Sequence, residues 1–163
     1  MNFENMPDHS RVWVYQADRF LSEEEQSTIH RLADIFIQEW AAHGSKLGAS
    51  YCIRHGLFFI LAVDEETAAA SGCSIDASVA FIKKLEDTLN VGFMDRLKIA
   101  FRDAENTIQV LGMEEFKTLI RLSQINENTV VFNNLVQNIG ELNSKWEVPA
   151  KESWHSQLFE LVK

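Results

Sequence analysis

Hydrophobic residues recur at helical spacing in several stretches of this chain. Between Ser22 and Gly44, apolar positions three and four residues apart fall on one face and predict an amphipathic helix. Ser22 and Glu25 have the spacing of a capping box, which begins such a helix, and Gly44 predicts its end. The same periodicity predicts helices over residues 74–89, 113–122 and 133–163, the last interrupted at 146–149.

Runs of β-branched and aromatic residues predict strands between these helices. Residues 57–63 form the most apolar run of the chain and predict a strand buried on both faces. Residues 50–55 alternate in polarity, and Gly56 links the two runs, so a hairpin is expected there. Further strands are predicted over residues 11–16, 97–102, 107–111 and 129–132, with a second hairpin turning at 103–106.

The order of these elements indicates the fold class. Two hairpins separated by a helix favour an α+β fold with a largely antiparallel sheet and helices on one face. The leading elements, β-α-β-β-α-β, have the order of a ferredoxin-like fold, and a β-α-β-α extension follows them. The length of 163 residues is typical of a single domain, which we expect to span residues 1–163.

Composition and charge narrow the classes of partner. The chain has 15 basic and 24 acidic residues and a net charge of −9, which disfavours nucleic acid and anionic membrane surfaces. No apolar run reaches the length of a membrane span, and the first residues lack the pattern of a secretory signal. Two separate cysteines without a CxxC motif suit a reducing compartment. These features predict a soluble cytoplasmic protein. They are compatible with a homo-oligomer.

The loop between the buried strand and the following helix carries the densest polar chemistry. Ser71, Gly72, Cys73, Ser74 and Asp76 lie where backbone N–H groups and a helix N-terminus together could hold a phosphate or carboxylate. Nearby acidic residues oppose such an anion. In the alternative interpretation, Ser74 caps the helix, Gly72 makes the turn and Cys73 packs as a small apolar residue.

Cys73 is also a candidate nucleophile. A thiol needs a base within hydrogen-bond reach, and His155 is the leading candidate, with His43 second. The alternative is that these histidines have surface or capping roles.

Other polar residues are candidate ligand contacts. Arg54, near the end of a predicted strand, could bind an acidic group or pair with one of the many acidic side chains. Asn133 and Asn134 follow a strand and could contact a ligand or cap a helix. Trp154 could form the wall of a site or belong to a tail folded over the sheet.

Metal binding is not indicated by residue spacing. The carboxylates of residues 64–66 and Asp76 could supply oxygen ligands to a hard cation. However, the sequence has no His-x3-His, HExxH or Cys-His pattern. No metal site and no cofactor are therefore predicted.

Several segments together carry a resemblance to a known family: residues 11–19, 40–44, 61–65, 71–76, 131–135, 146–149 and 153–155. With these segments, the chain resembles a family of small bacterial proteins of about this length whose function is not established. Members of that family often carry the label of ABC transporter ATPase, but the GxxxxGK[ST] loop that cradles nucleotide phosphates does not occur in this chain. The resemblance thus implies family membership and no reaction.

Two functions are compatible with these patterns. The first is a non-enzymatic domain that binds a small ligand or a protein near residues 71–76. The alternative is a thiol-dependent or hydrolytic enzyme that uses Cys73 with His155 or His43.

Overall fold

The computed structural model describes residues 2–42, 44–66 and 68–163, and it has an α+β fold. None of the helices within these ranges combines the length and the apolar character that a membrane crossing needs. In chain order, the elements are the 3-10 helix η1 (Phe3–Asn5), β1 (Arg11–Gln16), α1 (Glu23–Glu39), β2 (Ala41–Ala42), β3 (Ser45–Lys46), β4 (Gly48–Arg54), β5 (Phe58–Asp64), α2 (Gly72–Leu89), β6 (Lys98–Arg102), β7 (Ile108–Gly112), α3 (Met113–Arg121), β8 (Val130–Phe132), α4 (Ile139–Lys145), β9 (Glu147–Pro149), the 3-10 helix η2 (Ala150–Glu152) and α5 (Ser156–Leu161).

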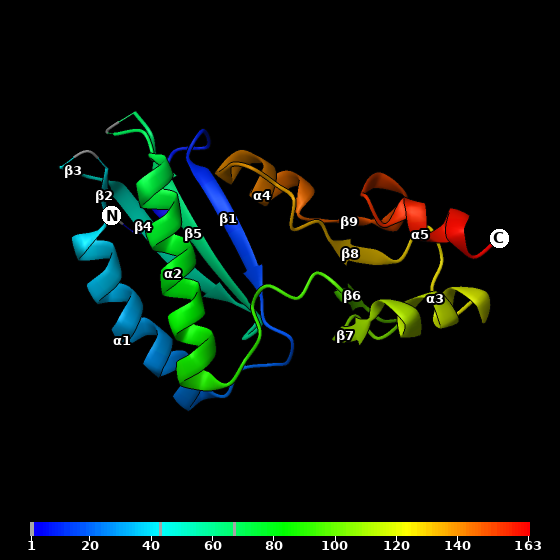
Figure 1. The fold of residues 1–163 in the computed structure, drawn as a ribbon. Coiled ribbons are helices and arrows are strands. Elements are labelled where there is room, and N and C mark those ends of the chain that lie inside the picture. Colours follow the sequence, from blue (N-terminus) through cyan, green and yellow to red (C-terminus); the bar gives the residue numbers. More distant parts are fainter. Residues whose placement is uncertain (1, 43, 67) are drawn as a thin grey trace.

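The first sheet has the strand order β1-β5-β4, and its strand pairs are antiparallel. The central strand β5 is buried at every position, as its continuous apolar run predicts. Helices α1 and α2 lie side by side across one face of this sheet (Figure 1). The predicted antiparallel sheet with helices on one face is confirmed by this arrangement.

A second antiparallel sheet has the strand order β7-β6-β8-β9. Its β6–β7 hairpin matches the prediction, whereas β9 lies where the sequence pattern indicates only an interruption between helices. The error arises because three residues are too few to reveal a period. β9 becomes a strand through its pairing with β8, in which Val148 lies opposite Val131.

The ferredoxin-like arrangement is not confirmed. That fold would place β6 beside β1 in one sheet, but β6 pairs with β7 and β8 instead. The outer edge of β1 is covered by the segment that precedes α4. There, the N–H of Val12 donates to the carbonyl of Gln137 at 3.0 Å, and Arg11 forms a bridge with Asn138.

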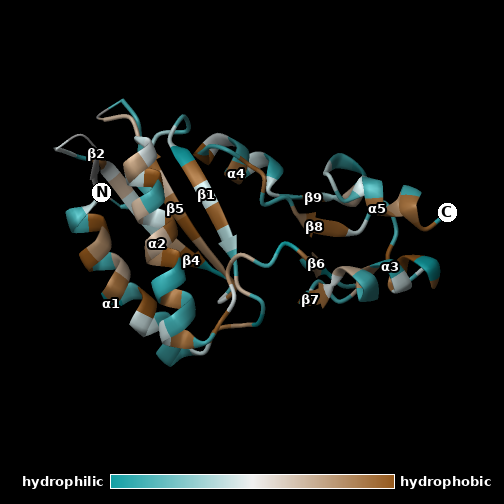
Figure 2. Ribbon diagram, in the orientation of Figure 1, coloured by the Kyte–Doolittle hydropathy of each residue, from teal (hydrophilic) through white to brown (hydrophobic). Residues whose placement is uncertain are grey.

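Apolar side chains join the two sheets. Phe58 of β5 packs against Phe132 of β8 and against Trp146, with 4.8 Å between ring centroids in each case. The neighbouring Val131 points to the opposite face, where it joins Phe116 in a cluster covered by α3 and α5. β8 is accordingly apolar along its length (Figure 2). A single domain over residues 1–163 stays a prediction.

Helix α1 begins as its sequence predicts and ends earlier. Ser22 accepts from the N–H of Glu25 at 3.1 Å, and Glu25 accepts from the N–H of Ser22 at 3.0 Å, which completes the capping box. The helix ends at Glu39 rather than near Gly44. Trp40 adopts extended backbone angles, and its buried side chain packs with Leu47 in a separate apolar cluster.

Candidate functional site

The segment before α2, where the sequence predicts a ligand site, is used to cap the helix. Ser71 is the N-cap: its hydroxyl accepts from the N–H of Ser74 at 3.1 Å, while the Ser74 hydroxyl accepts from the N–H of Ser71 at 2.7 Å. Ser74 is buried, and its carbonyl accepts from the Trp40 indole at 2.8 Å. The cap is therefore Ser71 and not Ser74, because the reciprocal serine bonds form at the start of the helix.

Gly72 and Asp76 gain no binding role from this geometry. Gly72 is the first residue of α2 and does not make the predicted turn. Asp76 is exposed in the next turn, and within the described residues it forms no ion pair. Helix capping thus accounts for Ser71 and Ser74, and this segment lines neither of the two cavities described below.

Cys73 and His155 do not meet. Cys73 is exposed at the beginning of α2, which corrects the expectation that it packs as an apolar residue. His155 is buried just before α5, and the first turn of α2 and α5 lie well apart (Figure 1). His43 lies outside the described residues. A nucleophile and its base must be within hydrogen-bond reach, and the structure does not bring Cys73 and His155 together (Figure 1).

His155 and Trp154 belong to the apolar cluster under α3 and α5. The two rings stack with 4.0 Å between centroids. The His155 Nδ1 lies 2.5 Å from the Ser153 hydroxyl, which already accepts from the His155 N–H at 3.2 Å. The Ser153 hydroxyl also donates to the carbonyl of Ala150 at 3.5 Å, so the direction of its bond with Nδ1 depends on the tautomer of the imidazole. Burial lowers the pKa of His155 to about 4, so the imidazole is neutral at neutral pH.

Asn134 helps to connect the two sheets, whereas Asn133 has a local role. The Asn134 Oδ1 accepts from the Trp146 indole at 2.9 Å, and its Nδ2 donates to the Gln16 side chain at 2.9 Å. Asn133 uses its side chain in a local turn. Neither residue caps a helix, so the predicted capping role is wrong. The reason is that the chain first continues past the edge of β1, and α4 begins only after that.

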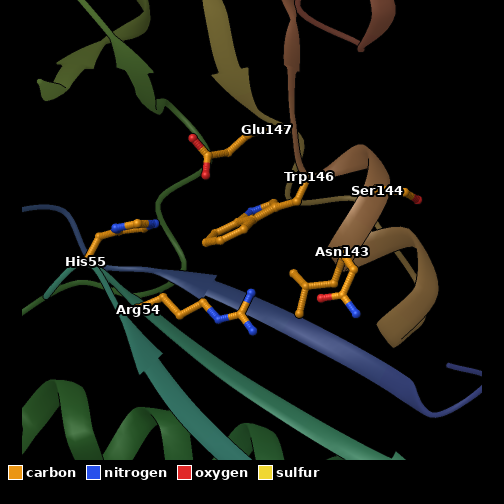
Figure 3. Close-up of a pocket in the computed structure, with 7 residues that line it drawn as sticks. Arg54, His55, Asn143, Ser144, Trp146 and Glu147 are labelled. Carbon is orange, nitrogen blue, oxygen red and sulfur yellow. The ribbon is translucent and has the colours of Figure 1, made fainter. Parts of the chain in front are cut away.

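A cavity of about 310 Å³ opens between the β4–β5 hairpin and the connection from α4 to β9. Figure 3 shows the Arg54 guanidinium near the Trp146 indole and directed toward Asn143, with the His55 ring beside the end of the indole. Arg54 is the predicted ligand residue that lines this space, which we call the Arg54 cavity. Its lining residues are Arg54, His55, Leu142, Asn143, Ser144, Trp146 and Glu147.

The β4–β5 turn sets the position of Arg54 and His55. His55 and Gly56 have φ angles of 59° and 60°, as in a tight two-residue hairpin turn. The N–H of Leu57 donates to the carbonyl of Arg54 at 3.1 Å and closes the turn. A side chain at position 56 would lie 3.0 Å from Gln26 as well as strain the backbone, so glycine is required there.

Two arginines near the cavity are held differently. Arg102 pairs with Glu147 at 2.5 Å and also donates to the carbonyl of Asn106 at 3.0 Å. The Arg54 guanidinium lies 3.5 Å from the exposed carboxylate of Glu4. Within the described residues, this contact is the one ion pair that Arg54 forms. Arg54 consequently keeps N–H donors available on the side of the cavity.

His55 adds a neutral polar group. Its ring stacks on Trp146 with 5.9 Å between centroids. Burial lowers the pKa of His55; the cations Arg102 and Arg54 act in the same direction, and Glu147 opposes them. The imidazole is therefore neutral at neutral pH and offers both a donor and an acceptor.

A larger cavity of about 790 Å³ lies between the β6–β7 hairpin and the α3–β8 connection. Its charged lining residues are Arg102 and Asp103. Arg102 is held by Glu147, and Asp103 accepts from the Gln109 side chain at 2.9 Å and from the N–H of Thr107 at 3.0 Å. Because Arg102 already has a carboxylate partner and Asp103 is an acid held by neutral donors, the Arg54 cavity is the better candidate for an anionic ligand.

Sequence reasoning selected Arg54 but missed His55, Trp146 and Glu147. The pair His55-Gly56 in a predicted hairpin turn was the available signal for a fixed histidine. No local pattern could have indicated the other two residues, because they come from a distant segment that packs against the hairpin.

Comparisons with protein-family models, with curated proteins and with solved structures found no match for this chain. The resemblance to the small bacterial family therefore stays a prediction. Function has to be inferred from the site itself.

Proposed function

We propose that this protein is a non-catalytic binding domain that takes a small ligand with a carboxylate or phosphate group in the Arg54 cavity. The orientation of Arg54 carries the proposal: its guanidinium faces the cavity, and its ion pair within the described residues is a 3.5 Å contact to the exposed Glu4. A guanidinium binds a carboxylate or phosphate through two parallel hydrogen bonds. An anion in the cavity would therefore have a ready partner.

The surroundings of Arg54 favour such binding. Its guanidinium carbon lies 5.6 Å from the Phe3 ring centroid and 5.8 Å from that of Trp146, so two aromatic faces restrict its motion. Restricting a long side chain before binding lowers the entropy lost on binding. The Arg54 side chain is 25% exposed, so a bound anion would be screened less than at an open surface.

Size and charge limit the class of ligand. A cavity of about 310 Å³ is at the lower end of small-molecule sites, which span roughly 300–1,000 Å³. The net charge of −9 disfavours anions at long range, so selection depends on the local guanidinium. Asn143 and the neutral His55 can donate further hydrogen bonds to the same ligand. These properties fit a small anion better than a protein partner.

Titration with inorganic phosphate and with succinate tests this function. We expect saturable chemical-shift changes at the Trp146 indole and the Asn143 side chain in ¹H–¹⁵N NMR spectra. Arg54→Gln should weaken binding at least tenfold, because hydrogen bonds to a charged group contribute about 1.5–3 kcal/mol. Arg121→Gln, which removes the same charge from an exposed position on α3, serves as the matched control and should bind like the wild type.

Two results would overturn the proposal. The first is the absence of saturable shifts at the cavity with either anion. The second is equal affinity of the Arg54→Gln and Arg121→Gln variants, because the guanidinium at position 54 would then have no part in binding.

A further inference from the structure

We propose that His9, Asp64 and Glu66, which we call the His9 cluster, bind a divalent transition-metal ion such as Zn²⁺ or Mn²⁺. The strand pairing brings these residues together. β1 runs antiparallel to β5, with Arg11 opposite Val63. His9, two positions before β1, therefore lies close to the residues at the end of β5. This site is separate from the Arg54 cavity and does not depend on the function proposed for it.

The distances within the His9 cluster suit a shared ion. The His9 Nε2 lies 3.1 Å from the Asp64 Oδ1 and 3.7 Å from the Glu66 Oε1. One potential ligand atom from each residue lies within 4.8 Å of the others. Atoms bound at about 2.0–2.2 Å from one ion lie roughly 3–4 Å apart. The side chains of His9 and Glu66 are 47% and 78% exposed, so small rotations can close the remaining gap.

The burial of Asp64 points independently to a ligand. Asp64 is 8% exposed, and no lysine or arginine within the described residues pairs with its carboxylate. Its Oδ1 accepts from His9 and from the N–H of Glu66 at 3.0 Å, whereas no hydrogen bond in the described part of the chain reaches its Oδ2. Buried carboxylates are normally paired with a cation or bound to a metal. The Asp64 Oδ2 thus has no hydrogen-bond partner among the described residues, and it is not fully buried, so a cation could reach it.

The charge around the cluster favours a cation. Arg11, the nearest arginine along the chain, pairs with Glu65 at 3.4 Å, so among the described residues His9 alone lies within ion-pair distance of Asp64 and Glu66. The Asp8 carboxylate adds a further negative charge near His9. An anion would be repelled from this position.

The ligand types indicate the class of ion. Imidazole suits Zn²⁺ and other first-row transition metals, while carboxylates also accept Mn²⁺. Mg²⁺ prefers oxygen ligands alone and retains its waters, so one imidazole and two carboxylates disfavour it. Three protein ligands would leave a coordination position for water or another molecule. Residue spacing could not predict this site, because His9 lies far from Asp64 and Glu66 in the sequence. Most of the residues of the first sheet come between them.

Calorimetric titration of the full chain with ZnCl₂, MnCl₂ and MgCl₂ tests the proposal. We expect saturable binding of Zn²⁺ or Mn²⁺ with one ion per chain at this site and weaker binding of Mg²⁺. His9→Gln should weaken binding more than tenfold, because loss of even an outer-shell partner of a metal costs roughly 10- to 100-fold. Mn²⁺ should also broaden the NMR signals of residues 9 and 64–66 before other signals.

The pair Glu66→Gln and Glu65→Gln is a matched control. Both variants remove one negative charge from the same segment, but Glu65 faces Arg11 rather than His9. We expect Glu66→Gln to weaken binding and Glu65→Gln to leave it unchanged. The proposal is overturned if neither Zn²⁺ nor Mn²⁺ saturates, if His9→Gln binds like the wild type, if both glutamate variants lose affinity equally, or if Mn²⁺ broadening centres elsewhere.

Discussion

Acidification should destabilise this protein through His155, and the size of the effect follows from its burial. His155 is 1% exposed, and burial lowers its pKa from the ordinary value of 6.5 to about 4. Between these two values, the unfolded chain binds a proton that the folded chain does not. The free energy of unfolding therefore falls as the pH decreases through this range.

The magnitude can be worked out from the two pKa values. Their difference corresponds to about 3 kcal/mol, which is present near pH 7 and lost as the pH falls toward 4. About 2 kcal/mol of this should already be lost at pH 5. A loss of this size is a substantial fraction of the roughly 5–15 kcal/mol that stabilises a typical domain.

Urea unfolding at several pH values between 7 and 5, followed by tryptophan fluorescence, measures the effect. His155→Phe removes the titrating group and keeps an aromatic ring in the cluster. Between pH 7 and 5, the free energy of unfolding of this variant should therefore fall by about 2 kcal/mol less than that of the wild type. Phe159→Leu is the control, because it weakens the same cluster without removing a titrating group. If the free energy of unfolding depends on pH in the same way for the wild type and for His155→Phe, the claim that His155 is buried in its neutral form is refuted.

Changes at other positions separate structural from reactive roles. At pH 8 a thiol reagent should modify the exposed Cys73 and spare Cys52 in the folded protein, because burial raises the pKa of Cys52 to about 12; equal rates would contradict this. Ser71→Ala should lower the free energy of unfolding in urea by about 1 kcal/mol through loss of the N-cap, and an unchanged value would show that the cap is dispensable. Asn134→Ala should lower it by about 1–3 kcal/mol, because the buried Trp146 indole loses its acceptor; wild-type stability would exclude that role for the bridge.

The positions of most helices and strands could be predicted from local sequence. The capping box at Ser22 and Glu25, the continuous apolar run of β5 and the turn at His55-Gly56 depend on contacts within a few residues. Hydrogen bonds and apolar periodicity of this kind leave a direct pattern in the chain. The α+β class and the antiparallel first sheet follow from these patterns.

The candidate sites depended on tertiary structure. Arg54 was recognisable as an arginine near a strand end, but its proximity to Trp146 results from packing between distant segments. His9 meets Asp64 because β1 pairs with β5 in a particular register. Neither relation has a characteristic spacing in the sequence.

The sequence by itself therefore determined the local elements, the acidic surface and the buried central strand. Tertiary structure alone decided that β6 joins a second sheet and that β9 is a strand. It also showed that the segment before α2 caps its helix through Ser71. The physical reason is that local hydrogen bonds and periodic burial act between neighbours in the chain. Sheet pairing and side-chain clusters instead depend on which distant surfaces bury the most apolar area together.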